Sequence, residues 1–209
     1  MNLPNKLTIC RMCAIPIVIV ISLIDALEHV IIFESVNLQD LLLLIIFALA
    51  SFTDYLDGHI ARKYNLVTNF GKFLDPIADK LLNTSLMVFL LVPQSYAVAQ
   101  RHDQTALTIL MICVIIMIAR DLVVDALRMI AVQKGEVIAA NMFGKVKTVL
   151  QMIAIPMLLL NDFPFHYFDS SWPEALQVSN IFFYLATLMS LISGIIYLVQ
   201  NHKVLKDTK

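Results

Sequence analysis

Long apolar runs separated by short polar loops dominate the hydrophobic pattern of this 209-residue chain. The runs cover residues 7–24, 41–63, 74–93, 105–132, 146–160 and 178–200. A helix needs about 20 mostly apolar residues to cross the hydrocarbon core of a bilayer. Although the fifth run is short and the first contains Arg11 and Pro16, the pattern predicts an all-α bundle of about six transmembrane helices. We expect one domain that covers residues 1–209.

The composition supports a membrane protein and argues against a single water-soluble core. Hydrophobic residues make up 59% of the chain and charged residues only 15%, whereas about a quarter of a soluble domain is charged. The three cysteines have neither zinc-site spacing nor a disulfide pattern. No P-loop or Rossmann fingerprint is present, and no nucleic-acid partner is expected.

The basic residues predict the orientation of the helices. If successive loops alternate sides, one side holds both termini, the loop between the second and third runs, and the loop between the fourth and fifth. That side and the adjoining helix ends carry every Lys and Arg except Arg101. Since cytoplasmic loops are enriched in Lys and Arg, we expect both termini in the cytoplasm and the protein in the bacterial inner (cytoplasmic) membrane.

Four carboxylates lie at the ends of the second and third runs, namely Asp54, Asp57, Asp75 and Asp79. A charge at the bilayer centre costs about 2.5–3.5 kcal/mol on insertion scales, so their presence needs a reason. Helical spacing of about 100° per residue puts Asp54 and Asp57 on one face with Gly58 and Ala61, whose small side chains leave room for a ligand. Asp75 and Asp79 are one turn apart, and the Pro76 between them predicts either a helix start or a kink at Asp75.

If these two helices are neighbours, the carboxylates converge beside a polar cavity that faces the cytoplasm. Hard cations such as Mg²⁺ or Mn²⁺ prefer oxygen ligands, and two ions about 3.5–4 Å apart form a clamp for phosphoryl chemistry. One alternative is that the acids pair with cations at the membrane surface, namely Arg62, Lys63, Lys72 and Lys80. Another is a divalent-cation transporter, although transporters tend to hold their ions near the bilayer midplane on broken helices.

The spacing D-x2-D-G-x2-A-R-x8-G-x3-D-x3-D is complete from Asp54 to Asp79. It resembles the signature of the CDP-alcohol phosphatidyltransferases, whose six-helix layout also fits this chain. The resemblance implies transfer of a phosphatidyl group from CDP-diacylglycerol to an alcohol, with two divalent ions, release of CMP and a homodimeric enzyme. It implies that Asp54, Asp57 and Asp75 bind metal, and that Asp79 contacts metal and acts as the base.

The same resemblance implies that the CDP moiety is bound by Gly58, Ala61, Arg62 and Gly71. The opening Pro4-Asn5-Lys6-Leu7-Thr8 is also similar to the family, and Asn5 is therefore expected near the donor phosphates. The alternative for this opening is a simple helix start after Pro4. His59 occupies a variable position of the motif and is expected to be a bystander.

A second polar group follows in the fourth and fifth runs, with candidate acceptor-binding cations at Arg120, Arg128, Lys145 and Lys147. Ion pairing among Asp121, Asp125 and Arg128, which share a helix face, is the alternative there, as is cytoplasmic anchoring for the lysines. The Ala119-Arg120-Asp121 and Gly144–Thr148 sequences resemble the branch of the family that uses sn-glycerol 3-phosphate. We therefore expect this acceptor, with phosphatidylglycerol, inositol phosphate and serine as alternatives.

Overall fold

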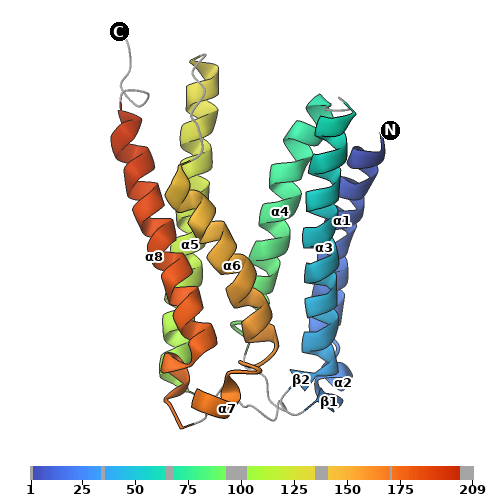
Figure 1. Ribbon diagram of the computed structural model, residues 1–209, viewed down its shortest axis with the longest axis vertical. Helices are drawn as coiled ribbons and strands as arrows, with labels where there is room; N and C mark the ends of the chain where they lie inside the picture. Colours follow the sequence, from blue (N-terminus) through green and yellow to red (C-terminus); the bar gives the residue numbers. More distant parts are fainter. Residues whose placement is uncertain are drawn as a thin grey trace. The chain divides into compact units, whose positions relative to one another are not determined.

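A computed structural model of the protein describes residues 2–33, 36–64, 68–92, 103–134, 141–169 and 171–202. Its elements, drawn in Figure 1, are α1 (Leu3–Ser22), α2 (Asp25–Glu28), β1 (Ile31–Phe33), β2 (Val36–Asn37), α3 (Leu38–Lys63), α4 (Asn69–Phe89), α5 (Gln104–Gln133), α6 (Met142–Leu159), α7 (His166–Asp169), η1 (Glu174–Leu176) and α8 (Val178–Gln200). The predicted helical membrane fold is confirmed, with a two-stranded antiparallel hairpin of β1 and β2 in addition.

Six long helices form where the six apolar runs were found, and five of them are long and apolar enough to cross a membrane: α1, α3, α5, α6 and α8. Within the part of the chain that the structure describes, α4 falls outside this group because its 21 residues include Lys72, Asp75, Asp79 and Lys80. The polar residues that make α4 a poor membrane span are those of the motif. A crossing by α4 stays a prediction.

Pro76 led us to expect either a helix start or a kink at Asp75, and the first of these expectations does not hold. The helix begins at Asn69, and Thr68 caps it by accepting a hydrogen bond from the Gly71 amide at 3.0 Å. Such a cap satisfies one of the amide groups that a helix start leaves without an intrahelical partner. Pro76 therefore lies inside the helix, and a helix start at Asp75 is wrong.

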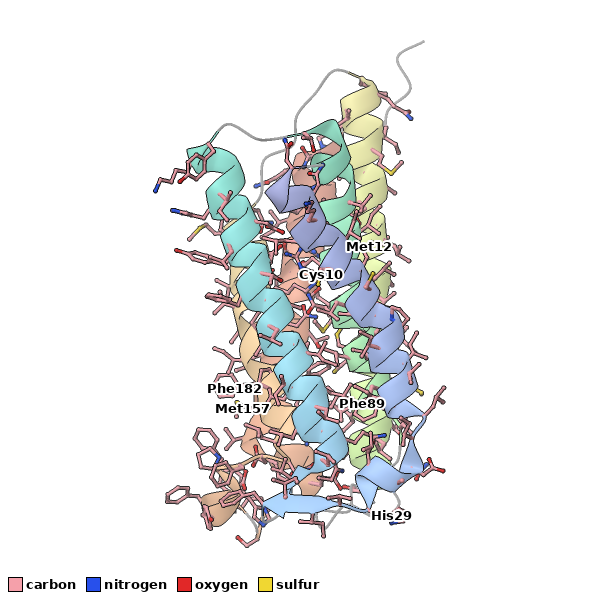
Figure 2. All side chains as sticks on the ribbon, turned by 90° about the vertical axis from the view of Figure 1, so that its right-hand side faces the viewer. Cys10, Met12, His29, Phe89, Met157 and Phe182 are labelled. Carbon is pink, nitrogen blue, oxygen red and sulfur yellow. The ribbon has the colours of Figure 1, made fainter. Side chains whose placement is uncertain are left out.

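The chain divides into two compact units. Unit 1 comprises residues 1–101 and 159–163. In it α1 packs against both α3 and α4, and buried side chains such as Val18, Leu43 and Leu86 form its core. Figure 2 shows Cys10 and Met12 on α1 toward one end of this unit and His29 at the other end, beside the hairpin.

Unit 2 comprises residues 102–158 and 164–209. In it α5 packs against α8, with Val124, Leu127 and Tyr197 buried together. Gly194 on α8 permits a close approach to α5, because a Cβ atom there would lie only 2.9 Å from Cγ of Arg120. A larger residue at position 194 would therefore displace the arginine.

Candidate functional site

One face of α1 carries a strip of three polar side chains, Asn5, Thr8 and Arg11. Positions three residues apart lie nearly above one another on a helix, so the three side chains point in one direction. All are buried, with 7%, 1% and 3% of their surface exposed, respectively. Polar groups that are buried to this degree require partners, and each of these finds one on α3, on α4 or at the cap of α4.

Arg11 joins the two motif aspartates of α3. Its Nη1 lies 2.8 Å from Oδ1 of Asp54, and its Nη2 lies 2.8 Å from Oδ2 of Asp57. This arrangement confirms that the two aspartates share one helix face. The side chain of Asp57 is 6% exposed, whereas that of Asp54 is 42% exposed. The pair therefore extends from the packed interior of unit 1 to its accessible edge.

Thr8 and Asn5 connect the strip to α4. The Thr8 hydroxyl donates to Oδ1 of Asp75 at 2.6 Å, and Oδ1 of Asn5 accepts from the Thr68 hydroxyl at 2.9 Å. A Cβ atom on Gly71 would lie 3.0 Å from Oδ1 of Asn5 and 3.7 Å from Oδ2 of Asp75. The structure thus brings together three residues that the sequence predicted for donor and metal binding, namely Asn5, Gly71 and Asp75.

Asp79 lies one turn beyond Asp75 on α4 and is partly buried. Its Oδ1 accepts a hydrogen bond from Nδ2 of Asn83 at 3.2 Å. The role of Asp79 as the base that deprotonates the acceptor stays a prediction.

The alternative for these acids was ion pairing with cations at the membrane surface. In the structure, Asp54 and Asp57 form ion pairs with Arg11 of α1. Lys63, one of the proposed surface cations, is exposed with its Nζ 5.6 Å from the centre of the Tyr64 ring. The side chains of Arg62 and Lys72 lie outside the described residues.

The donor set fits a hard divalent ion by its chemistry, because it consists of carboxylate oxygens from two neighbouring helices. Asp57 and Asp75 each accept a hydrogen bond from α1, and Asp54 forms an ion pair with Arg11. Each of these contacts uses one oxygen of the carboxylate. As described, however, the chain has no group of three or more His, Cys, Asp or Glu side chains close enough to hold a metal ion. The guanidinium of Arg11 lies between the carboxylates of Asp54 and Asp57 and pairs with both.

The remaining motif residues lie on the last two turns of α3. Gly58 is partly buried and follows Asp57 directly, whereas His59 is exposed and stacks on Tyr55 with 6.2 Å between ring centres. Ala61 and Arg62 are helical, and nothing is described of their side chains. The expectation that they contact the CDP moiety stays a prediction.

In unit 2, two of the four candidate acceptor-binding cations converge on one carboxylate. Asp121 accepts from Nη1 of Arg120 at 2.8 Å and from Nζ of Lys147 at 2.7 Å. Arg128, two turns further along α5, instead donates to the Tyr197 hydroxyl at 2.7 Å. The structure therefore separates Arg120 and Lys147, which form one cluster, from Arg128.

Lys145 also lies apart from this cluster. It is two residues from Lys147, which corresponds to about 200° around a helix. Accordingly Lys147 is buried against Asp121 while Lys145 is exposed. Lys147 therefore lies in one cluster with Arg120, as a shared phosphate site would require. Lys145 does not, and its predicted contact with the acceptor phosphate stays a prediction.

Sequence reasoning missed the polar residues that support Arg120. Its Nη2 donates to the Ser193 hydroxyl, which in turn donates to Oδ1 of Asn141 at 3.1 Å. The same Asn141 oxygen accepts from the Gly144 amide at 2.8 Å and so caps α6. A Cβ atom on Gly144 would lie 3.6 Å from Nη2 of Arg120, so the first turn of α6 lies directly against the guanidinium.

Comparison with known proteins adds the evidence from relatives. The sequence profile described as CDP-alcohol phosphatidyltransferase matches residues 1–198. A protein of Bacillus subtilis named CDP-diacylglycerol–glycerol-3-phosphate 3-phosphatidyltransferase is 41% identical over 209 residues, covering 99% of this chain and 98% of its own. A protein of the same name from Rickettsia bellii is 36% identical, with 94% of this chain and 93% of its own covered. An Arabidopsis thaliana protein whose name adds the number 2 is 33% identical, with 98% and 81% coverage.

Proposed function

The chain belongs to the CDP-alcohol phosphatidyltransferase family, and we propose that it transfers the phosphatidyl group of CDP-diacylglycerol to sn-glycerol 3-phosphate. The products are phosphatidylglycerophosphate and CMP. The observation that carries this proposal is the near full-length similarity to relatives named for this reaction. Membership in a family of transferases also argues against a divalent-cation transporter. The protein is an integral membrane enzyme with five long apolar helices in its described part.

We propose that Asp54, Asp57, Asp75 and Asp79 hold two divalent ions, Mg²⁺ or Mn²⁺. When bound, the ions offset the charge of the donor pyrophosphate and of the phosphate oxygens during transfer. The proposal is supported by the oxygen-only donor set of α3 and α4 and by the family motif. The α1 strip would keep the carboxylates of both helices in place.

Asp79 is the proposed general base. It takes the proton from the acceptor hydroxyl, whose oxygen then forms a bond to the lipid-linked phosphorus. The bond between this phosphorus and the oxygen of CMP breaks, and CMP leaves with the electron pair. Asn5, Gly58, Ala61, Arg62 and Gly71 are proposed to bind the CDP moiety. The proposal is supported by the family motif and by the close approach of Asn5 to Gly71.

The acceptor phosphate is proposed to bind at Arg120 and Lys147. A phosphomonoester carries nearly two negative charges and three acceptor oxygens, and an arginine can engage it with two parallel hydrogen bonds. Asp121 keeps the two cations together in the absence of a ligand. Arg128 and Lys145 stay candidates on the basis of the sequence. Among the interactions described, neither contacts the cluster of Arg120, Asp121 and Lys147.

The acceptor assignment is tested directly by product formation from CDP-diacylglycerol. Purified protein should be supplied with sn-glycerol 3-phosphate, phosphatidylglycerol, inositol phosphate or serine at equal concentration. We expect efficient turnover with sn-glycerol 3-phosphate alone. Turnover of another acceptor in its absence would contradict the assignment while leaving the reaction class intact.

Arg120→Ala and Lys147→Ala should each raise the KM for sn-glycerol 3-phosphate by about 10–100-fold, because each removes a charge-assisted hydrogen bond worth about 1.5–3 kcal/mol. The KM for CDP-diacylglycerol should change little. Lys134→Ala, at the exposed C-terminal end of α5, is the control and should leave both constants unchanged. Equal increases in the two KM values would show that the cluster does not select the acceptor.

We propose that both termini face the cytoplasm, which puts the aspartates near the cytoplasmic surface. In a cysteine-free background, His29→Cys should react with an impermeant maleimide in intact cells, and Lys63→Cys only after permeabilisation, since both side chains are exposed at opposite ends of unit 1. Labelling of both from one side would contradict this orientation. The homodimer implied by the family stays a prediction.

A further inference from the structure

Arg11 is a buried cation that takes no direct part in the chemical steps of the proposed reaction. Only 3% of its surface is exposed, and it lies on a helix apolar enough to span a membrane. A buried charge is tolerated when it is paired, and Arg11 is paired with both Asp54 and Asp57 at 2.8 Å. The guanidinium also offsets the mutual repulsion of two carboxylates that are one turn apart on α3.

We propose that Arg11 is a built-in counter-cation that weakens binding of divalent ions to the aspartates and makes this binding depend on the CDP headgroup. The inference rests on the proposed function, which assigns Asp54 and Asp57 as ligands of those ions. Arg11 would fill the place of a mobile cation when the site holds no ion. It would thereby keep the two aspartates paired in the free enzyme.

Formal charges explain why the donor would then matter. The four aspartates and two divalent ions cancel, so Arg11 leaves the loaded site with one positive charge in excess. The pyrophosphate of the donor brings two negative charges, which change the loaded site from one positive charge to one negative charge. Because charges interact strongly where water is largely excluded, we expect the free site to bind its ions weakly and the site with donor to bind them well.

The opposite effect would follow if Arg11 only positioned the carboxylates. Partners that orient metal ligands typically strengthen metal binding about 10–100-fold, so their removal weakens it. Removal of a repelling cation strengthens it. The sign of the change in affinity therefore distinguishes the two roles without reference to activity.

The test measures binding of Mn²⁺ to purified full-length protein in detergent, with free Mn²⁺ quantified by electron paramagnetic resonance. Wild-type protein should bind Mn²⁺ at least about tenfold more tightly with CDP than without it. Arg11→Gln should bind Mn²⁺ alone at least about tenfold more tightly than wild type and should gain less from CDP. Arg11→Lys, which keeps the charge, should resemble wild type. Lys63→Gln removes an exposed charge from the same helix as the aspartates and should also resemble wild type.

Equal or weaker Mn²⁺ binding by Arg11→Gln would overturn the inference. If Arg11→Gln does not fold, Arg11→Lys provides the test. Mn²⁺ binding by Arg11→Lys that no longer depends on CDP would contradict a role for the positive charge. CMP release by wild type is measured in parallel. If wild type releases no CMP while Arg11→Gln binds Mn²⁺ more tightly, the proposed reaction is rejected and the counter-cation role is retained. Failure of the proposed function and failure of this inference are therefore distinguishable.

Discussion

Asp75→Asn and Asp57→Asn are each expected to lower the rate of phosphatidyl transfer by about 10²–10⁴-fold. Each substitution removes one charged metal ligand. A metal stabilises the transferring phosphoryl group by several kcal/mol, and each 1.36 kcal/mol of lost stabilisation lowers the rate about tenfold. The measurement is the initial rate of CMP release by purified protein. Asp25→Asn, an exposed acid of α2 outside the motif, is the matched control and should retain the wild-type rate.

The structure makes Asp75→Asn the cleaner of these two variants. Asp75 accepts a hydrogen bond from Thr8, and the amide oxygen of an asparagine can accept the same bond. Asp57 pairs with the buried Arg11, so Asp57→Asn also removes a charge from a buried ion pair, a change that can cost several kcal/mol of stability. A rate near that of wild type in folded Asp75→Asn would disprove the metal assignment.

Asp79→Asn is expected to reduce kcat by about 10²–10⁴-fold, the usual contribution of a general base, while CDP-diacylglycerol still binds. The reason is that an amide cannot take the proton of the acceptor hydroxyl. Single-turnover kinetics and donor binding by the purified variant provide the two measurements. Asn83→Ala, which removes one hydrogen-bond donor to Asp79 but keeps the carboxylate, should reduce kcat far less.

A different outcome would reassign Asp79. If Asp79→Asn abolished donor binding while the residual complex turned over at the normal rate, the residue would be a metal ligand without a role in proton transfer. Because Asp75 is one turn away on the same helix, the comparison with Asp75→Asn separates the two roles within one scaffold.

Local periodicity accounts for the parts of this structure that the sequence could predict. Apolar runs located the six long helices because a membrane helix must be apolar over its length, and the spacing of Asp54 and Asp57 put them on one face because the separation is a single turn. The same rule applied to Lys145 and Lys147 would have separated them.

The contacts that complete the site could not be predicted in this way, because they join residues far apart in the chain. Arg11 and Asp57 are 46 positions apart, and Thr8 and Asp75 are 67 apart. A cation inside an apolar run was visible in the sequence, and its helical spacing from Thr8 and Asn5 is a signal that points to a common polar face. Which carboxylate each residue meets depends on how α1 packs, and no local pattern encodes that.

The measurement that most directly tests the account is release of CMP from CDP-diacylglycerol by the purified protein, with and without sn-glycerol 3-phosphate and with and without Mg²⁺ or Mn²⁺. The account predicts CMP together with phosphatidylglycerophosphate only when donor, acceptor and divalent ion are all present, and no reaction after chelation of the ion. Undiminished formation of phosphatidylglycerophosphate in the presence of excess chelator, or no product under the complete conditions, would contradict it.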